Sequence, residues 1–196
     1  MDEKRRETLT KYLGDMRAVV HHVEEAMERQ EQEFKDQPDV SALIGRTVTL
    51  LRAQKEAIGS RLDALGGSPT HPVKEGVAAV AGVIAGLYNK VRTEGAAKGL
   101  RDDHVALNWT YVSYMTLTVT GVALGDRETA SLAERGMREC ATAAMDVQRI
   151  LPTVVLRELQ DGGFGALDPS AVEEARNAIA EAWSRESPAN ERTAIS

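Results

Sequence analysis

The sequence contains one cysteine, Cys140, among its 196 residues. A single thiol cannot form an internal disulfide, and it cannot build a cysteine cluster around a metal. Aromatic residues make up only 4% of the chain, whereas alanine, leucine, valine, glutamate and arginine give it a helix-favouring composition. No block of basic residues occurs, and the formal net charge is -6 at pH 7, which argues against a nucleic-acid partner.

The N-terminus lacks a recognisable targeting segment, because Met1 to Thr10 is charged and has no apolar core. Residues Val105 to Leu124 carry no charge over about the length of a membrane-spanning helix. However, Asn108, Ser113 and several threonines interrupt this stretch, and its aromatic residues cluster instead of marking two membrane interfaces. We therefore predict a cytoplasmic protein without a membrane span, in which residues 105–124 form the most buried helix.

Apolar residues recur along most of the chain every three or four positions, which is the spacing of one helix face. This pattern predicts helices at residues 2–35, 40–65, 73–91, 102–124, 127–159 and 170–183. Asp39 is expected to cap the second helix and Gly66-Gly67 to end it. Residues Thr93 to Leu100 are predicted to be a loop, so that Asp102-Asp103 opens the next helix. Pro152 is expected to kink or interrupt the helix that contains it.

The pattern contains no predicted strand, and the economical architecture is an all-α, antiparallel four-helix bundle. The helix at 73–91 would lie in the long crossover between the second and fourth helices. We expect a bundle over residues 1–161, a linker at 162–169 and a C-terminal helix at 170–185 that opens with a capping box at 170–173. The remaining residues, 186–196, are polar and predicted to be disordered.

The residues that bind metals in such bundles are inward-facing glutamates and Glu-x-x-His pairs. This sequence contains no Glu-x-x-His. The reversed pairs His21–Glu24 and His22–Glu25 do occur, but they fall beside the apolar stripe of the first helix. We predict that they form a solvated polar face and bind no metal.

Other candidate residues are isolated. His71 lies between prolines and His104 lies at the start of a helix, and neither has a second ligand nearby in sequence. Glycine-rich nucleotide-binding motifs and nucleophile elbows are missing. Cys140 is predicted to be a half-buried structural thiol. Trp109 and Tyr111 could line a pocket, although filling of the core is the commoner role of aromatic residues at helical spacing.

Three local patterns resemble the YciE/YciF-type ferritin-like stress proteins of bacteria. Residues 55–66 run into a Leu-Gly turn that is similar to the family's, and residues 107–117 include the family's Tyr-x-Thr-Leu at 114–117. The helix around 132–151 has a similar length and place. The likeness covers about residues 9–159, and it implies a ferritin-like bundle.

The same resemblance implies a degenerate metal site. Other residues occupy the positions where the family carries ligands in the first, second and fourth helices: Val23, Gln54, Leu107, Asn108 and Thr110. Glu139, in the fifth helix, is the one carboxylate that the likeness retains. A single carboxylate cannot hold two hard cations, which take several oxygen ligands each. We therefore expect no metal, no cofactor and no catalytic residue.

Our first hypothesis is a non-enzymatic, metal-free bundle that acts through self-association or a protein partner, with a stress-related role implied by the resemblance. One alternative is a divergent di-iron or single-metal oxidase or iron-handling protein that uses Glu139. The other is a small-molecule binder with a core pocket near Trp109 and Tyr111.

The last helix is expected to take part in the association. Val172, Ile179 and Trp183 form an apolar stripe on a helix too short to be stable alone. Symmetric dimers are the commonest soluble oligomers. We therefore predict a homodimer to which this helix contributes.

Overall fold

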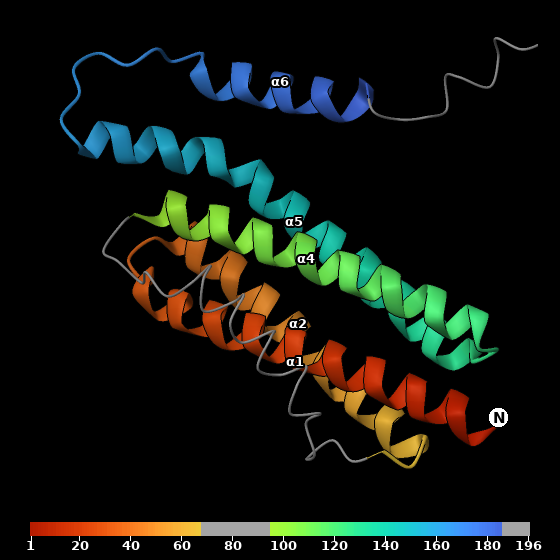
Figure 1. Ribbon diagram of the computed structural model, residues 1–196. Helices are drawn as coiled ribbons and strands as arrows, with labels where there is room; N and C mark the ends of the chain where they lie inside the picture. Colours follow the sequence, from red (N-terminus) through yellow and green to blue (C-terminus); the bar gives the residue numbers. More distant parts are fainter. Residues whose placement is uncertain (68–94, 186–196) are drawn as a thin grey trace, which may run out of the picture. The chain divides into compact units, whose positions relative to one another are not determined.

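The computed structural model describes residues 1–67 and 95–185, and every regular element within these residues is a helix (Figure 1). The predicted all-α class is therefore confirmed. The helix predicted at 73–91 and the tail predicted at 186–196 lie outside the described residues. Among the helices that are described, none is long and apolar enough to cross a membrane.

The first two helices are α1, Glu3–Glu33, and α2, Pro38–Ala64. α2 ends as predicted, with Gly66 at a φ of +74° and the amide of Gly67 donating 2.9 Å to the carbonyl of Leu62. The prediction that Asp39 caps α2 is wrong, because the helix already begins at Pro38. The fixed φ of proline and its missing N–H suit the first helical position.

The helix α4 spans Ala96–Ala123 and begins earlier than predicted, so the expected loop over residues 93–100 is wrong from Ala96 onward. Ala96 and Leu100 are fully buried. Gly99 allows α4 to approach α1 closely, since a Cβ atom at Gly99 would lie 2.8 Å from Cε2 of Phe34. Glycine therefore serves packing in this helix and does not break it.

The remaining helices are α5, Arg127–Asp161, and α6, Ala171–Arg185. Pro152 was expected to kink or interrupt its helix; α5 continues through it, so the interruption does not occur. The chain nevertheless divides into two compact units, Met1–Gln148 and Arg149–Ser196. The division falls after Gln148, which lies four residues before Pro152. Because proline has no N–H group, the carbonyl of Gln148 lacks its usual donor within the helix.

The first unit is the antiparallel four-helix bundle, made of α1, α2, α4 and the part of α5 up to Gln148. α1 packs against both α2 and α4, as Figure 1 shows. Its core contains large side chains from all of the first three helices, including Leu9, Leu13, Val20, Met27, Ile44, Leu51, Ile58, Leu62, Leu100, Leu107, Tyr114 and Leu117. α5 contributes mostly smaller residues such as Ala133, Cys140 and Val147.

A charged network joins the end of α2 to the start of α5. Arg61 donates to both carboxylate oxygens of Asp126, at 2.6 and 2.7 Å, and to the hydroxyl of Thr129 at 3.1 Å. It also pairs with Glu128. Burial alone would raise the pKa of Asp126, but the hydrogen bonds from Arg61 and Thr129 outweigh it and lower that pKa. The network therefore fixes the turn that precedes α5.

The prediction that residues 105–124 form the most buried helix is wrong on one face. Leu107, Tyr114 and Leu117 are buried as expected. The opposite face of α4 exposes large apolar side chains: Val105 44%, Val112 47%, Met115 44%, Val119 64% and Val122 45%. The lack of charge in this stretch thus reflects both a core face and an uncovered apolar face.

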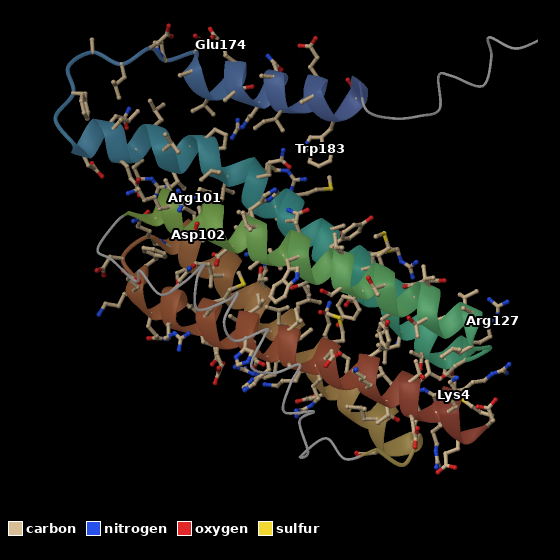
Figure 2. All side chains as sticks on the ribbon, viewed as in Figure 1. Lys4, Arg101, Asp102, Arg127, Glu174 and Trp183 are labelled. Carbon is tan, nitrogen blue, oxygen red and sulfur yellow. The ribbon has the colours of Figure 1, made fainter. Side chains whose placement is uncertain are left out.

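The second unit contains the end of α5, a connection at 162–170 and α6. Arg176 of α6 donates to the hydroxyl of Thr153 at 3.3 Å. The predicted capping box with Glu173 does not form, because the hydroxyl of Ser170 contacts Asp168 and Glu174 instead. Trp183, labelled in Figure 2, remains 61% exposed on α6.

Candidate functional site

A buried polar cluster lies in the middle of the bundle and is centred on Gln54 of α2. The Nε2 of Gln54 donates 2.8 Å to Oε2 of Glu139 on α5, and its Oε1 accepts from the hydroxyl of Tyr114 on α4 at 3.1 Å. The thiol of Cys140 lies 3.7 Å from the same Oε1. We call these four side chains the central polar cluster. Two residues at predicted ligand positions, Gln54 and Glu139, are therefore brought together.

The two weak acids of the central polar cluster are held protonated. Burial, followed by the nearby Cys140 and Glu139, raises the pKa of Tyr114 well above its usual range. Burial raises the pKa of Cys140 to about 12, although the contact with Gln54 lowers it. Cys140 is fully buried, more deeply than predicted. Neither the phenol nor the thiol is therefore available as an anionic ligand or nucleophile at neutral pH.

The ring of Tyr114 is seated directly over the backbone of α5. A Cβ atom at Gly136 would lie 2.3 Å from Cζ of Tyr114 and 2.6 Å from both Cε atoms. Glycine is thus required at position 136 for Tyr114 to reach Gln54.

We expect Gly136→Ala to lower the free energy of unfolding by about 1–3 kcal/mol, because the ring must move out of a packed core. Gly14→Ala is the matched control, since no atom lies within 4 Å of a Cβ atom there. That control should be stabilising by up to about 1 kcal/mol, the helix-propensity difference between glycine and alanine. Urea denaturation of both variants measures the two effects, and a stabilising Gly136→Ala would contradict the close approach.

A groove between α2 and α5 leads from the surface to the central polar cluster. Its inner part is a cavity of about 210 Å³ whose apolar walls include Leu50 and Leu132, with Gln54, Tyr114 and Glu139 among its polar residues. A second cavity of about 380 Å³ continues the groove and shares Leu50 and Glu139 with the first. Neither Trp109 nor Tyr111, the residues predicted to line a pocket, contributes to these cavities.

The central polar cluster does not fit a di-metal centre. Its donors are one carboxylate, one carboxamide whose two ends are already hydrogen-bonded, a phenol and a thiol that both stay protonated. Pairs of hard cations require several carboxylate or histidine ligands. Within residues 1–67 and 95–185, no group of three or more histidine, cysteine, aspartate and glutamate residues could hold a metal ion.

The other positions that resemble ligands are filled by buried apolar side chains or by polar ones that bond to their own helix. Val23 and Leu107 are fully buried apolar residues. The hydroxyl of Thr110 donates 2.8 Å to the carbonyl of Ala106, and the amide of Asn108 donates 2.8 Å to the carbonyl of His104. Both polar side chains are therefore committed to the backbone of their own helix.

The histidines of α1 lie at the surface, in contact with Glu25. The imidazoles of His21 and His22 approach its carboxylate to 3.6 and 3.7 Å. Glu24, by contrast, is buried, and the prediction that it belongs to a solvated face is wrong. It pairs with Lys55 and, at 3.3 Å, with Arg52 of α2, so its role is to join two helices.

Of the two remaining histidines, the structure describes only His104. The Nδ1 of His104 lies 3.0 Å from the carbonyl oxygen of Ala144, which places this residue in the contact between α4 and α5. His71 lies outside the described residues.

A second candidate site is the exposed apolar face of α4, which the sequence reasoning missed. Its exposed apolar positions recur with a spacing of seven: Val105, Val112 and Val119 form one set, and Met115 and Val122 form the other, which the half-buried Asn108 precedes by seven residues. We call these six residues the α4 seam. The sequence does contain a signal for an uncovered face. Residues 105–124 include Asn108, Ser113 and several threonines, and a helix buried on every side would not carry so many polar residues.

Comparison with known proteins places the bundle among characterised folds. The sequence model of a family described as "Domain of unknown function (DUF892)" matches residues 4–160. A search of curated proteins finds no match.

Solved structures do resemble the chain. A protein from Xanthomonas campestris is 20% identical, with a TM-score of 0.68, and the match covers 82% of this chain and 99% of that one. An archaeal Dps homologue from Halobacterium salinarum is also 20% identical, with a TM-score of 0.63 and coverage of 87% and 88%. Identity at this level shows the fold alone, and the predicted ferritin-like fold is confirmed.

Proposed function

The chain belongs to the DUF892 family of YciF-type ferritin-like proteins, and from this premise we propose that it is a non-enzymatic bundle that holds no metal and acts through self-association. A cytoplasmic and stress-related role in a bacterium is part of the proposal. That part is supported by the resemblance of residues 55–66 and 107–117 to the YciE/YciF-type proteins.

The observation that carries the proposal is the closed hydrogen bonding of the central polar cluster. Gln54 uses both ends of its carboxamide inside the cluster, with Glu139 on one side and Tyr114 on the other. A cation that entered the central polar cluster would break these hydrogen bonds. The one carboxylate that the cluster offers in their place is that of Glu139. Hydrogen-bonded polar networks of this kind specify packing, so the cluster supports a structural role for the former ligand positions.

We expect protein purified from cells grown with added iron to contain iron, manganese and zinc well below one metal per chain. The physical reason is the donor set, which offers a single carboxylate. Elemental analysis of the wild type, of Glu139→Ala and of Glu25→Ala measures this, with Glu25 as an exposed carboxylate control. One or two metals per chain, lost in Glu139→Ala and kept in Glu25→Ala, would favour the oxidase or iron-handling alternative.

Self-association is tested separately, by light scattering on the full-length chain across micromolar concentrations. The proposal expects a dimer. A monomer throughout this range would remove the functional proposal, whatever the metal content.

A second candidate function, small-molecule binding, is favoured by the groove between α2 and α5. Apolar walls that surround a few polar groups are typical of ligand sites. Charged side chains line this groove as well: Arg46, Arg135, Arg138, Glu139 and Asp146. Among them the half-buried carboxylate of Glu139 borders both cavities, so it would contact a ligand in either. A compound that raises the melting temperature of the wild type but not of Glu139→Gln would support this candidate.

A further inference from the structure

The wider cavity of the groove between α2 and α5 has a volume of about 380 Å³, and we call it the outer cavity. Its walls are largely apolar: Leu43 and Ala143 are buried, and Leu50 is half-buried. Ligand sites in proteins usually measure roughly 300–1,000 Å³. The outer cavity lies at the lower end of this range, so it suits a small molecule with an apolar part.

Glu139 borders the outer cavity where it meets the inner one, and it uses only one of its two carboxylate oxygens in the central polar cluster. Its Oε2 accepts from Gln54 at 2.8 Å. Within residues 1–67 and 95–185, no group donates a hydrogen bond to its Oε1. A half-buried carboxylate oxygen without a donor favours a ligand that supplies one, and a charged donor forms the stronger hydrogen bond.

Two guanidinium groups line the same cavity, one from each helix. Arg46 of α2 and Arg138 of α5 are both exposed. Among the residues that the structure describes, Arg46 has no ion-pair partner, and Arg138 has a distant one, Glu134 at 3.9 Å. Asp146, the second carboxylate of the outer cavity, already interacts with another residue. Both guanidinium groups are therefore able to receive an anion.

Charges of opposite sign thus occur close together in the outer cavity without neutralising each other. Arg138 and Glu139 are adjacent in the sequence, and neighbouring positions of a helix do not face each other. The carboxylate of Glu139 attracts an ammonium group, whereas planar guanidinium groups match a carboxylate. An α-amino acid carries both of these groups on one carbon atom.

We infer that the outer cavity binds a free α-amino acid with an apolar side chain. Its ammonium group donates to Oε1 of Glu139, and its carboxylate accepts from Arg46 and Arg138. The apolar side chain packs against Leu43 and Leu50. This inference rests on the small-molecule binding proposed above and names the class of ligand.

The charges of the cavity favour this class over a ligand with a single charge. A simple anion would pair with the two guanidinium groups but would meet Glu139 as a like charge. A simple cation would pair with Glu139 but would meet Arg46 and Arg138 as like charges. Like-charge contacts of this kind are the means by which a site rejects the wrong ligand.

Titration of the full-length protein with L-leucine, N-acetyl-L-leucine and L-leucinamide tests the inference, with two-dimensional NMR of the backbone amides as the readout. The three probes share one apolar side chain, but N-acetylleucine lacks the ammonium group and leucinamide lacks the carboxylate. Leucine should shift the signals of residues 43–50 and 138–146. It should bind at least about tenfold more tightly than either other probe, because each of them loses a charge-assisted contact.

Variants assign each end of the ligand to its partner. Glu139→Gln should weaken leucine binding about tenfold without weakening N-acetylleucine, which has no ammonium group. The double variant Arg46→Gln/Arg138→Gln should weaken leucine without weakening leucinamide. Glu25→Gln and Arg29→Gln are the matched controls, since both residues are exposed on α1, outside the groove. These controls should leave all three dissociation constants unchanged.

The outcomes separate this inference from the function on which it rests. Leucinamide that binds as tightly as leucine would make the groove a cation site, and N-acetylleucine that does so would make it an anion site. Either result overturns the amino-acid assignment and leaves small-molecule binding in the groove standing. Leucine binding that persists unchanged in Glu139→Gln and in the double variant places the site elsewhere and overturns the inference.

Absence of any shift with all three probes at millimolar concentrations also overturns the assignment. Small-molecule binding would then be decided by the melting temperatures of the wild type and Glu139→Gln with other compounds.

Discussion

Replacement of Leu117 by alanine is expected to lower the free energy of unfolding by about 2–5 kcal/mol. Leu117 lies on the inner face of α4 and is only 1% exposed. The truncation removes buried methyl groups and leaves a cavity that the surrounding helices cannot fill completely. Chemical denaturation monitored by circular dichroism measures the loss.

Val119→Ala is the matched control for this prediction, because it truncates an apolar residue two positions further along the same helix. Val119 is 64% exposed, so its truncation should change the free energy of unfolding of the monomer by about 0.5 kcal/mol or less. The measurement belongs at a concentration where the protein is monomeric. Equal effects at positions 117 and 119 would show that the assignment of inner and outer faces is wrong.

Arg61→Ala is expected to lower the free energy of unfolding by about 3–5 kcal/mol, since it leaves a buried carboxylate without its cation. Arg61 is the shared partner of Asp126, Glu128 and Thr129, and it is well shielded from solvent. Arg52→Ala is the control, because Arg52 is half exposed and its partner Glu24 retains Lys55. Exposed pairs contribute about 1 kcal/mol or less, so thermal or urea denaturation should separate the two variants clearly.

The same network predicts a dependence on pH. The pKa of Asp126 is lowered in the folded protein, so its ionisation stabilises the fold above its ordinary value of 3.8 and ceases to do so as the pH falls through the lowered pKa. The difference in stability between wild type and Asp126→Asn should therefore be largest above roughly pH 5 and shrink below it. A difference that stays constant down to pH 2 would show that folding does not lower the pKa of Asp126.

The central polar cluster shows which parts of the site can be predicted from the sequence and which cannot. The resemblance to the YciE/YciF-type proteins points to Gln54 as a replaced ligand position and to Glu139 as the one retained carboxylate. Their hydrogen bond joins residues 85 positions apart, and the contact with Tyr114 depends on a glycine at position 136. Such contacts depend on the rotation and axial shift of three helices, which periodicity within one helix does not specify.

The sequence by itself determined the helices of the bundle, because the three-and-four spacing of apolar residues and the Gly66-Gly67 stop act within one segment. The expectation that the chain binds no metal also comes from the sequence, since it depends on which residue types are present. Only the tertiary structure decided where α4 begins and which of its faces is covered. The start at Ala96 follows from packing against α1, and the uncharged run at 105–124 is divided between core and surface by its neighbours. Hydrophobicity records that a residue favours burial, but the surface that buries it comes from another part of the fold or from another chain.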